Sequence, residues 1–229
     1  MKTIKPIIKI SVMKAIKFSV FATVICGLNF AYSQNIKFVK KYPFPGMNGG
    51  LGACKTSDGG IAITGQHESG HYCRVYIAKI NKCGALQWYK IYDFGYSAGG
   101  VSITETYDGG LVVAGAADLT GSIYDWLVMK VDANGNYLWH DLWRNGPTLH
   151  CGREWAQSIT ELPNHNLAAA GGNYMGFNSG CDGLKNDGVV SFYALNGTYL
   201  YTKKLAGPDY DMFLNITQNG NYIVTTQQG

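Results

Sequence analysis

A unit of about fifty residues recurs along this chain, and this repeat constrains the fold more than any other feature does. Asp58–Gly60 (DGG) precedes an apolar run, and fifty residues later Asp108–Gly110 (DGG) does so again. Weaker copies begin at Asn164 and Asn219, at further offsets of 56 and 55 residues. Periods of this length are typical of folds built from one repeated supersecondary unit. The fold of the chain therefore follows from the fold of the unit.

Each unit contains four short runs that are typical of β-strands. In the second unit, Val101–Glu105 is followed by a Gly turn and a second apolar run. A variable loop, the run Trp126–Val131, another Gly turn and the aromatic-rich run Asn136–Trp139 complete it. The runs are rich in β-branched and aromatic residues and are bounded by Gly, Asn and Asp. This pattern predicts four strands joined by tight turns and loops.

The second and third runs of each unit are apolar on both faces. Alternate side chains of Trp126–Val131 point to opposite sides of a strand, and all but Lys130 are apolar. A sheet of this kind must be covered on both sides. Stacked neighbouring units would supply that cover, which predicts an all-β β-propeller of four-stranded antiparallel blades. A linear β-solenoid is the alternative architecture, although its turns are usually shorter than this repeat.

The repeat also predicts the limits of the blades within a partial β-propeller at 34–229. A lone fourth strand is expected first, because the residues up to Tyr42 match the fourth strand that ends at Tyr92. Three full blades and a partial blade follow. The predicted ranges are 35–43 for the lone strand, 45–95, 96–146 and 147–209 for the blades, and 210–229 for the partial blade. About three and a half blades form an incomplete ring, so we expect a fragment of a longer protein or an open arc.

Residues 1–33 are predicted to be a signal peptide. Five lysines precede the apolar run Phe18–Phe30, and Ala31–Ser33 gives a small-x-small cleavage pattern. The start is at Met1 or Met13, because the segment from Met13 is a complete signal by itself. The apolar run is too short for a comfortable membrane span. We therefore expect a protein that is secreted or on the cell surface, without a transmembrane segment after cleavage.

The leader also accounts for the positive charge of the chain. Without its lysines, 14 basic residues face 15 acidic ones, so no basic surface supports a nucleic-acid partner. Export permits disulfides among the five remaining cysteines. Cys151 and Cys181 form the preferred pair because both lie in irregular stretches of one unit. The alternative is that all five cysteines are reduced and partly buried.

His67, Glu68 and His71 match the zinc-protease pattern HExxH. That motif works on a helix, which places both histidines on one side of a zinc ion. Here it falls between two predicted strands at 61–65 and 74–80, a space too short for such a helix. We interpret the match as coincidental and the segment as a polar surface loop. No other catalytic set is recognisable, and we predict neither a metal nor a cofactor.

Aromatic residues fall into two groups. Trp88, Trp139 and Tyr201 recur at one position of the fourth strand, which favours packing between blades. Non-repeating aromatics in variable stretches are better candidates for binding. The insert at 171–185 is the longest departure from the repeat. The predicted ligand-binding residues are Tyr174, Met175, Phe177, Trp155 and Trp143, and Tyr72 and Tyr124 belong to the same non-repeating group.

The combined pattern, DGG before an apolar strand and then DWLVMKVDANGNYLW, resembles the repeat of secreted β-propeller proteins from Bacteroidetes-type bacteria. The resemblance covers roughly residues 36–229 and is strongest in the second unit. Proteins of that group often end in a sorting domain for type IX secretion. The resemblance implies export and a propeller fold. It implies no particular activity.

These observations favour an exported, non-catalytic scaffold that acts as an extracellular binding or adhesion module, with a glycan or a protein as its partner. Two alternatives stay open. One is an extracellular glycan hydrolase using carboxylates such as Asp118, Glu154 or Asp182 at the mouth of the propeller. The other is a structural spacer within a longer secreted protein. Whether the chain is an enzyme is left open, with the non-catalytic interpretation preferred.

Overall fold

The fold is all-β. A computed structural model of the 229-residue chain describes residues 40–44, 46–121, 124–143, 153–174, 188–205, 212–219 and 222–228. These residues form fourteen strands and no helix. Accordingly, this described part contains no helix that could cross a lipid bilayer. The predicted leader at 1–33 lies outside the described residues.

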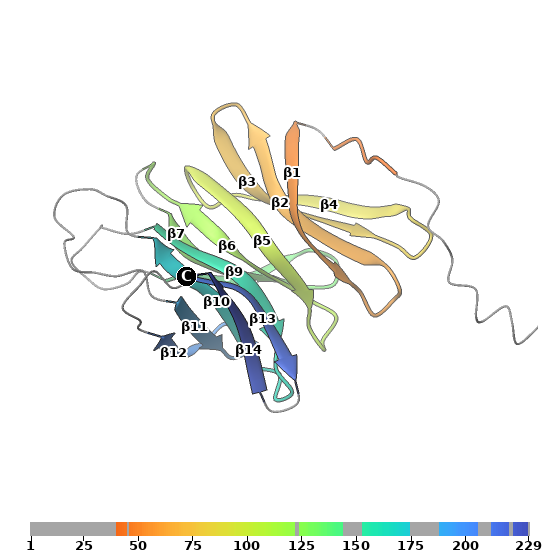
Figure 1. The fold of residues 1–229 in the computed structure, drawn as a ribbon. Coiled ribbons are helices and arrows are strands. Elements are labelled where there is room, and N and C mark those ends of the chain that lie inside the picture. Colours follow the sequence, from red (N-terminus) through yellow and green to blue (C-terminus); the bar gives the residue numbers. More distant parts are fainter. Residues whose placement is uncertain are drawn as a thin grey trace, which may run out of the picture. The chain divides into compact units, whose positions relative to one another are not determined.

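The first eight strands are linked into one eight-stranded sheet, which consists of two antiparallel four-stranded groups, called the first and the second sheet below (Figure 1). The first sheet consists of β1 (Met47–Lys55), β2 (Ile61–Ser69), β3 (Tyr72–Ile80) and β4 (Leu86–Tyr92). The second sheet consists of β5 (Ser97–Glu105), β6 (Leu111–Asp118), β7 (Asp125–Val131) and β8 (Tyr137–Trp143). Within each sheet the strands pair in chain order, and one parallel bridge between Cys73 and Ser97 joins the two sheets.

A third sheet and a final hairpin complete the described fold. The third sheet consists of β9 (Arg153–Glu161), β10 (Leu167–Tyr174), β11 (Gly188–Tyr193) and β12 (Tyr199–Leu205). The final hairpin consists of β13 (Met212–Asn219) and β14 (Tyr222–Gln228). Each sheet falls inside the residue range predicted for one unit. The predicted all-β class with mostly antiparallel strands is therefore confirmed.

The lone strand expected at 35–43 stays a prediction, because residues 35–39 lie outside the described residues. Residues 40–44 are described and are not in a strand. The side chain of Tyr42 nevertheless makes the same kind of hydrogen bond as Tyr92, the residue with which it aligns. Its hydroxyl donates to the Gly84 carbonyl at 2.9 Å, and the Tyr92 hydroxyl donates to the Gly135 carbonyl in the next turn at 2.8 Å.

The DGG turns require a left-handed backbone, which glycine adopts without strain. Gly59 and Gly109 have φ angles of 80° and 77°. In the third sheet His165 occupies the same place with a φ angle of 63°. Its imidazole lies 2.9 Å from Glu161 Oε1 and packs on the Tyr107 ring at 3.8 Å, and these contacts hold the strained conformation in place.

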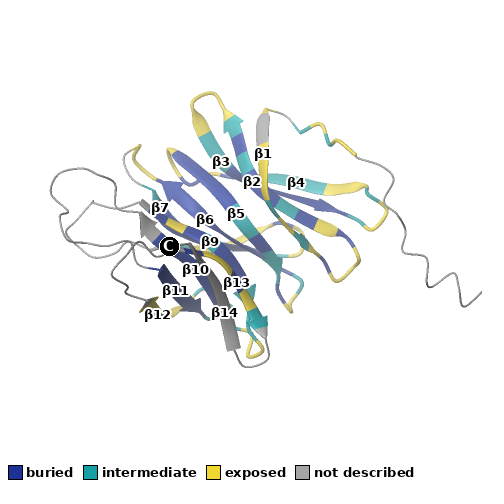
Figure 2. Ribbon diagram, in the orientation of Figure 1, coloured by how far each residue is buried: buried dark blue, intermediate teal, exposed yellow. Residues whose placement is uncertain are grey.

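The hydrophobic core lies between successive sheets. Val113, Leu127 and Met129 face a core shared with the first sheet, whereas Val112 and Val128 on the same strands face a core shared with the third sheet. A third core joins the back of the third sheet to β13. Figure 2 shows the result, because β6 and β7 are buried along their whole length while β4 carries exposed residues. The strands that are apolar on both faces are therefore covered by neighbouring sheets.

A buried lysine fixes the DGG turn in the first two sheets. Lys130 Nζ donates to Thr106 Oγ1 at 2.9 Å and to both carboxylate oxygens of Asp108 at 2.9 and 2.8 Å. Lys79, Thr56 and Asp58 repeat this arrangement in the first sheet. In the third sheet all three positions change together to Leu162, Asn164 and Phe192. The three positions therefore change as a set: they are polar in the first two sheets and largely apolar in the third.

We expect Lys130→Met to destabilise the protein, because it leaves Asp108 and Thr106 without their shared donor. Hydrogen bonds to charged groups suggest a loss of about 1–3 kcal/mol in the free energy of unfolding. Combining it with Thr106→Leu and Asp108→Asn, as in the third sheet, should recover part of that loss. Denaturant unfolding measures both effects, and the exposed Lys82→Met is the matched control. A single variant as stable as the control would contradict the role of the network.

The same network predicts a loss of stability in acid. Hydrogen bonds from Lys79, Thr56 and Gly60 hold the pKa of Asp58 well below its usual range. Burial opposes ionisation of Asp108, but the bonds from Lys130, Thr106 and Gly110 outweigh it and lower its pKa. Because the folded-state pKa values lie below the unfolded value of about 4, this stability is present above about pH 4 and is lost as the pH falls further.

Tm should therefore fall as the pH drops below about 4, and Asp108→Asn should show a smaller acid-induced decrease than the unaltered chain. Thermal unfolding at a series of pH values measures the difference. Identical pH profiles for the two proteins would show that Asp108 is not linked to stability in this way.

Candidate functional site

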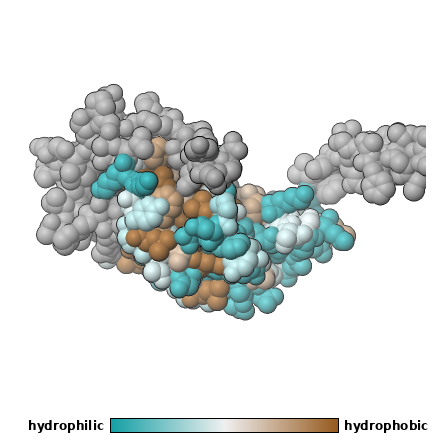
Figure 3. All heavy atoms as spheres, turned by 90° about the horizontal axis from the view of Figure 1, so that it is seen from below, coloured by the Kyte–Doolittle hydropathy of each residue, from teal (hydrophilic) through white to brown (hydrophobic). Residues whose placement is uncertain are grey.

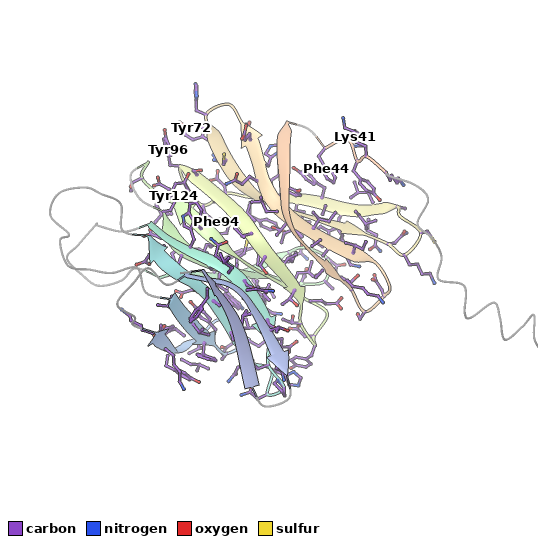
Figure 4. All side chains as sticks on the ribbon, viewed as in Figure 1. Lys41, Phe44, Tyr72, Phe94, Tyr96 and Tyr124 are labelled. Atoms are coloured by element: carbon purple, nitrogen blue, oxygen red, sulfur yellow. The ribbon has the colours of Figure 1, made fainter. Side chains whose placement is uncertain are left out.

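Four aromatic residues gather at one end of the three sheets, at the opposite end from the DGG turns. Tyr72 begins β3, Tyr96 precedes β5, Tyr124 precedes β7 and Trp155 lies near the start of β9. In an antiparallel four-stranded unit the first and third strands start at the same end, so all four residues come together there. Figure 4 shows Tyr72, Tyr96 and Tyr124 at this end. We call these four residues the aromatic strip.

The strip is made of two perpendicular ring pairs joined by a hydrogen bond. Tyr72 and Tyr96 lie 5.5 Å apart at 86°, and Tyr124 and Trp155 lie 6.1 Å apart at 79°. The Tyr124 hydroxyl donates to Ser97 Oγ at 3.2 Å, next to Tyr96 in the chain. Tyr72, Tyr96 and Trp155 are 45%, 46% and 40% exposed. The strip therefore offers aromatic surface to solvent across three sheets.

Polar contacts hold the first ring pair in place. Arg74 Nε forms an ion pair with Asp93 Oδ2 at 2.8 Å, and its guanidinium lies 5.2 Å from the centre of the Tyr72 ring. The backbone of Gly121 runs close to Tyr96, because a Cβ there would lie 3.2 Å from that ring. Tyr72 and Tyr96 are therefore positioned by neighbours before any ligand binds, which lowers the entropic cost of binding.

Buried carboxylates lie beside the strip. Asp118 Oδ1 accepts the backbone N–H groups of Thr120 and Gly121 at 2.9 and 2.7 Å, and so shapes the loop after β6. Glu154 is buried at the start of β9, where its backbone N–H donates to the Tyr124 carbonyl at 2.9 Å. Asp118 and Glu154 are two of the three carboxylates considered for a hydrolase, and Asp182 lies outside the described residues. Asp118 thus has a structural task in the loop beside the strip.

The HExxH match lies on a β-hairpin. β2 extends to Ser69 and β3 begins at Tyr72, so His67 and Glu68 are strand residues and His71 belongs to a two-residue turn. The expected polar surface loop is therefore wrong for His67, which is buried with its Nδ1 3.1 Å from the Tyr89 hydroxyl. The strands were predicted too short because polar residues at the end of β2 interrupt its apolar pattern. Among the described residues, no group of three His, Cys, Asp or Glu side chains could hold a metal ion.

The structure describes the side chain of one of the five predicted ligand-binding residues, Trp155. Trp143 ends β8 and Tyr174 ends β10, and their side chains lie outside the described part, as do Met175 and Phe177 entirely. Trp155 comes together with Tyr72 and Tyr124, which belong to the same non-repeating group. Tyr96 was missed, although it also has no aromatic counterpart in the other units. The signal that could have identified Tyr96 is its position in the segment that connects two sheets.

Two of the three aromatic residues that recur in the fourth strand, Trp88 and Trp139, pack against the following unit. The Trp139 indole N–H donates to the Leu195 carbonyl at 3.0 Å, and Trp88 packs against the core between the first two sheets. Tyr201 is 48% exposed and stacks on Phe192 at 4.5 Å. The packing role is therefore seen for the two tryptophans.

No family model matches the chain, and no curated protein sequence matches it. One matching solved structure is a protein of unknown function from Bacteroides caccae, with 15% identity and a TM-score of 0.44. The match covers 66% of this chain and 46% of that one. A eukaryotic initiation factor matches at 10% identity and a TM-score of 0.44, over 73% of this chain and 35% of its own. This chain thus spans less than half of either, and likenesses of this strength identify neither a family nor a function.

The cysteines give a chemical test of the fold. Cys54, Cys73 and Cys83 are free thiols, whereas the predicted Cys151–Cys181 pair lies outside the described residues. Burial raises the pKa of the Cys54 thiol to about 11, while Cys83 is exposed. Because the thiolate is the reactive form, iodoacetamide should modify Cys83 at least about tenfold faster than Cys54. Peptide mass spectrometry over time measures the rates, and equal rates in the folded protein would contradict the burial of Cys54.

Proposed function

We propose that this chain is an exported, non-catalytic β-propeller segment whose aromatic strip binds an extracellular glycan. The observation that carries the proposal is the strip itself. It presents exposed rings from three successive sheets at a single end of the fold. A repeat scaffold usually carries its function in residues that differ between copies, and all four strip residues do so.

The propeller part of the proposal is supported by how the sheets follow one another. Each new sheet begins beside the third strand of the one before it, at Cys73 with Ser97 and at Tyr124 with Glu154. Each also buries one face against the preceding sheet. Radial stacking of four-stranded blades produces this pattern. Export is supported by the leader at 1–33, with its lysines, apolar run and small-x-small site.

The chemistry of the strip suits sugars. One face of a pyranose ring carries C–H groups of slightly positive charge, and an aromatic face carries the negative part of its quadrupole. Tyrosine hydroxyls and the indole N–H can also bond to sugar hydroxyl groups. Perpendicular ring pairs form notches, which suits the individual residues of a soluble chain better than a flat crystalline surface. We therefore expect a soluble polysaccharide as ligand.

The test is binding of the purified protein to an array of bacterial, plant and animal glycans, followed by calorimetry with the best ligand. Tyr96→Ala and Trp155→Ala should each weaken binding by about tenfold, the usual loss when a stacking aromatic is removed. Tyr137→Ala is the matched control, because Tyr137 is equally exposed but lies at the opposite end of the second sheet. Its affinity should be unchanged.

Two outcomes would contradict the proposal. One is that no glycan binds. The other is that strip variants and the control bind equally well. Incubation of the same polysaccharides with the unaltered chain and with Glu154→Gln separates binding from hydrolysis. Reducing ends that accumulate with the unaltered chain and are lost with Glu154→Gln would favour the hydrolase instead.

A further inference from the structure

The aromatic strip consists of two ring pairs, and each pair lies at a boundary between two sheets. In the first pair, called the first notch, Tyr72 belongs to the first sheet and Tyr96 leads into the second. In the second pair, called the second notch, Tyr124 leads into β7 of the second sheet and Trp155 lies on β9 of the third. The two notches therefore follow one another in the same order as the sheets.

The fold holds the two notches next to each other. The Tyr124 hydroxyl of the second notch donates to Ser97 Oγ at 3.2 Å, and Ser97 follows Tyr96 in the chain. Ser97 is buried and is paired with Cys73, the residue after Tyr72. Ser97 thus contacts one notch and adjoins both residues of the other. The spacing between the notches is therefore set before any ligand binds.

A loop of the second sheet braces the first notch. Asp118 Oδ1 accepts the backbone N–H groups of Thr120 and Gly121, and these two hydrogen bonds fix the loop after β6. A Cβ on Gly121 would lie 3.2 Å from the Tyr96 ring, so the loop backbone is packed against that ring. Asp118 is therefore a positioning residue, which acts on the first notch through the loop.

The second notch is held by contacts between the second and third sheets. The backbone N–H of Glu154 donates to the Tyr124 carbonyl at 2.9 Å, which joins the two segments that carry its rings. Trp155 itself is paired with Gly172 on β10. The two notches are therefore positioned by different sets of contacts, and a substitution can disturb one of them without disturbing the other.

We propose that the two notches bind successive parts of one linear glycan chain, which crosses from the first sheet to the third. The inference rests on the proposed function and specifies its ligand as a chain that reaches both notches, rather than a free sugar. A single notch offers only one ring pair, so a free sugar binds weakly. Once one part of a chain is held, the next part is at a high local concentration beside the other notch, which favours binding there.

Calorimetry with a length series tests the proposal on the full chain. The probes are oligomers obtained by partial hydrolysis of the polysaccharide that binds best on the glycan array, from single sugars upward. Affinity should rise by at least about tenfold once the oligomers reach both notches, and should change little beyond that length. The stoichiometry should fall from two short oligomers per protein to one long oligomer.

Variants of either notch should remove this dependence on length. Tyr96→Ala and Trp155→Ala should each bind long oligomers about as weakly as the unaltered protein binds short ones. Each variant should still bind one short oligomer at its remaining notch, which shows that it is folded. Tyr137→Ala, outside the strip, is the matched control and should keep the full rise in affinity.

The loop after β6 gives a second way to disturb the first notch alone. Asp118→Ala should act like Tyr96→Ala, whereas Asp118→Asn keeps an accepting oxygen and should bind long oligomers normally. If Asp118→Ala does not fold, Gly121→Ala takes its place, because a Cβ there would press on the Tyr96 ring. Unchanged binding of long oligomers by the Ala variant would contradict the role of the loop.

Two results would overturn the proposal of a single bound chain. One is an affinity that is the same for single sugars and for long oligomers. The other is a stoichiometry of two long oligomers per protein, because each notch would then bind its own chain. Both results leave the glycan-binding function in place, since the probes still bind. Failure of every glycan on the array to bind contradicts that function itself, so the two failures are distinguishable.

Discussion

Burial of each sheet by the next is the constraint on which this structure depends. β6 has Val112 and Val113 on opposite faces, and each enters a different core. Burying such a side chain contributes about 1.5–3 kcal/mol, but only while the neighbouring sheet is in place. A four-stranded unit separated from its neighbours would lose this contribution on both faces, so we expect neighbouring units to fold cooperatively. This is the energetic logic of repeat proteins in general.

The amino-acid sequence predicts the strands well because turns and strands carry local signals. Gly59 and Gly109 mark turns that need a left-handed residue, and the apolar runs that follow them are long enough to identify. Local signals fail where tertiary contacts decide the conformation. His67 is buried against Tyr89, which lies more than twenty residues away in the chain. The sequence near His67 does not predict this contact. Residues 40–44 illustrate the same limit, since a strand needs a partner strand as well as a pattern.

The candidate site was predictable in part. Non-repeating aromatics identified Tyr72, Tyr124 and Trp155, because a residue that breaks the repeat is not needed by the scaffold. The grouping of these residues was not predictable. Tyr72 and Tyr96 meet only because strands from two units start at the same end, and Tyr124 reaches Ser97 only across a sheet boundary. Figure 3 shows why surface hydropathy alone is a poor guide, since apolar and polar side chains are interspersed over the face it presents.

Contacts between units also bear on how such a chain can diverge. The Tyr92 hydroxyl and the Trp139 indole both donate to backbone carbonyls in the turn of the following unit. A carbonyl is present whatever residue occupies the position, so these turns can accumulate substitutions without losing the bond. The three turns at 81–84, 132–135 and 194–197 share little beyond their final glycine. Duplicated units can therefore drift apart in sequence while the docking geometry between them is inherited unchanged.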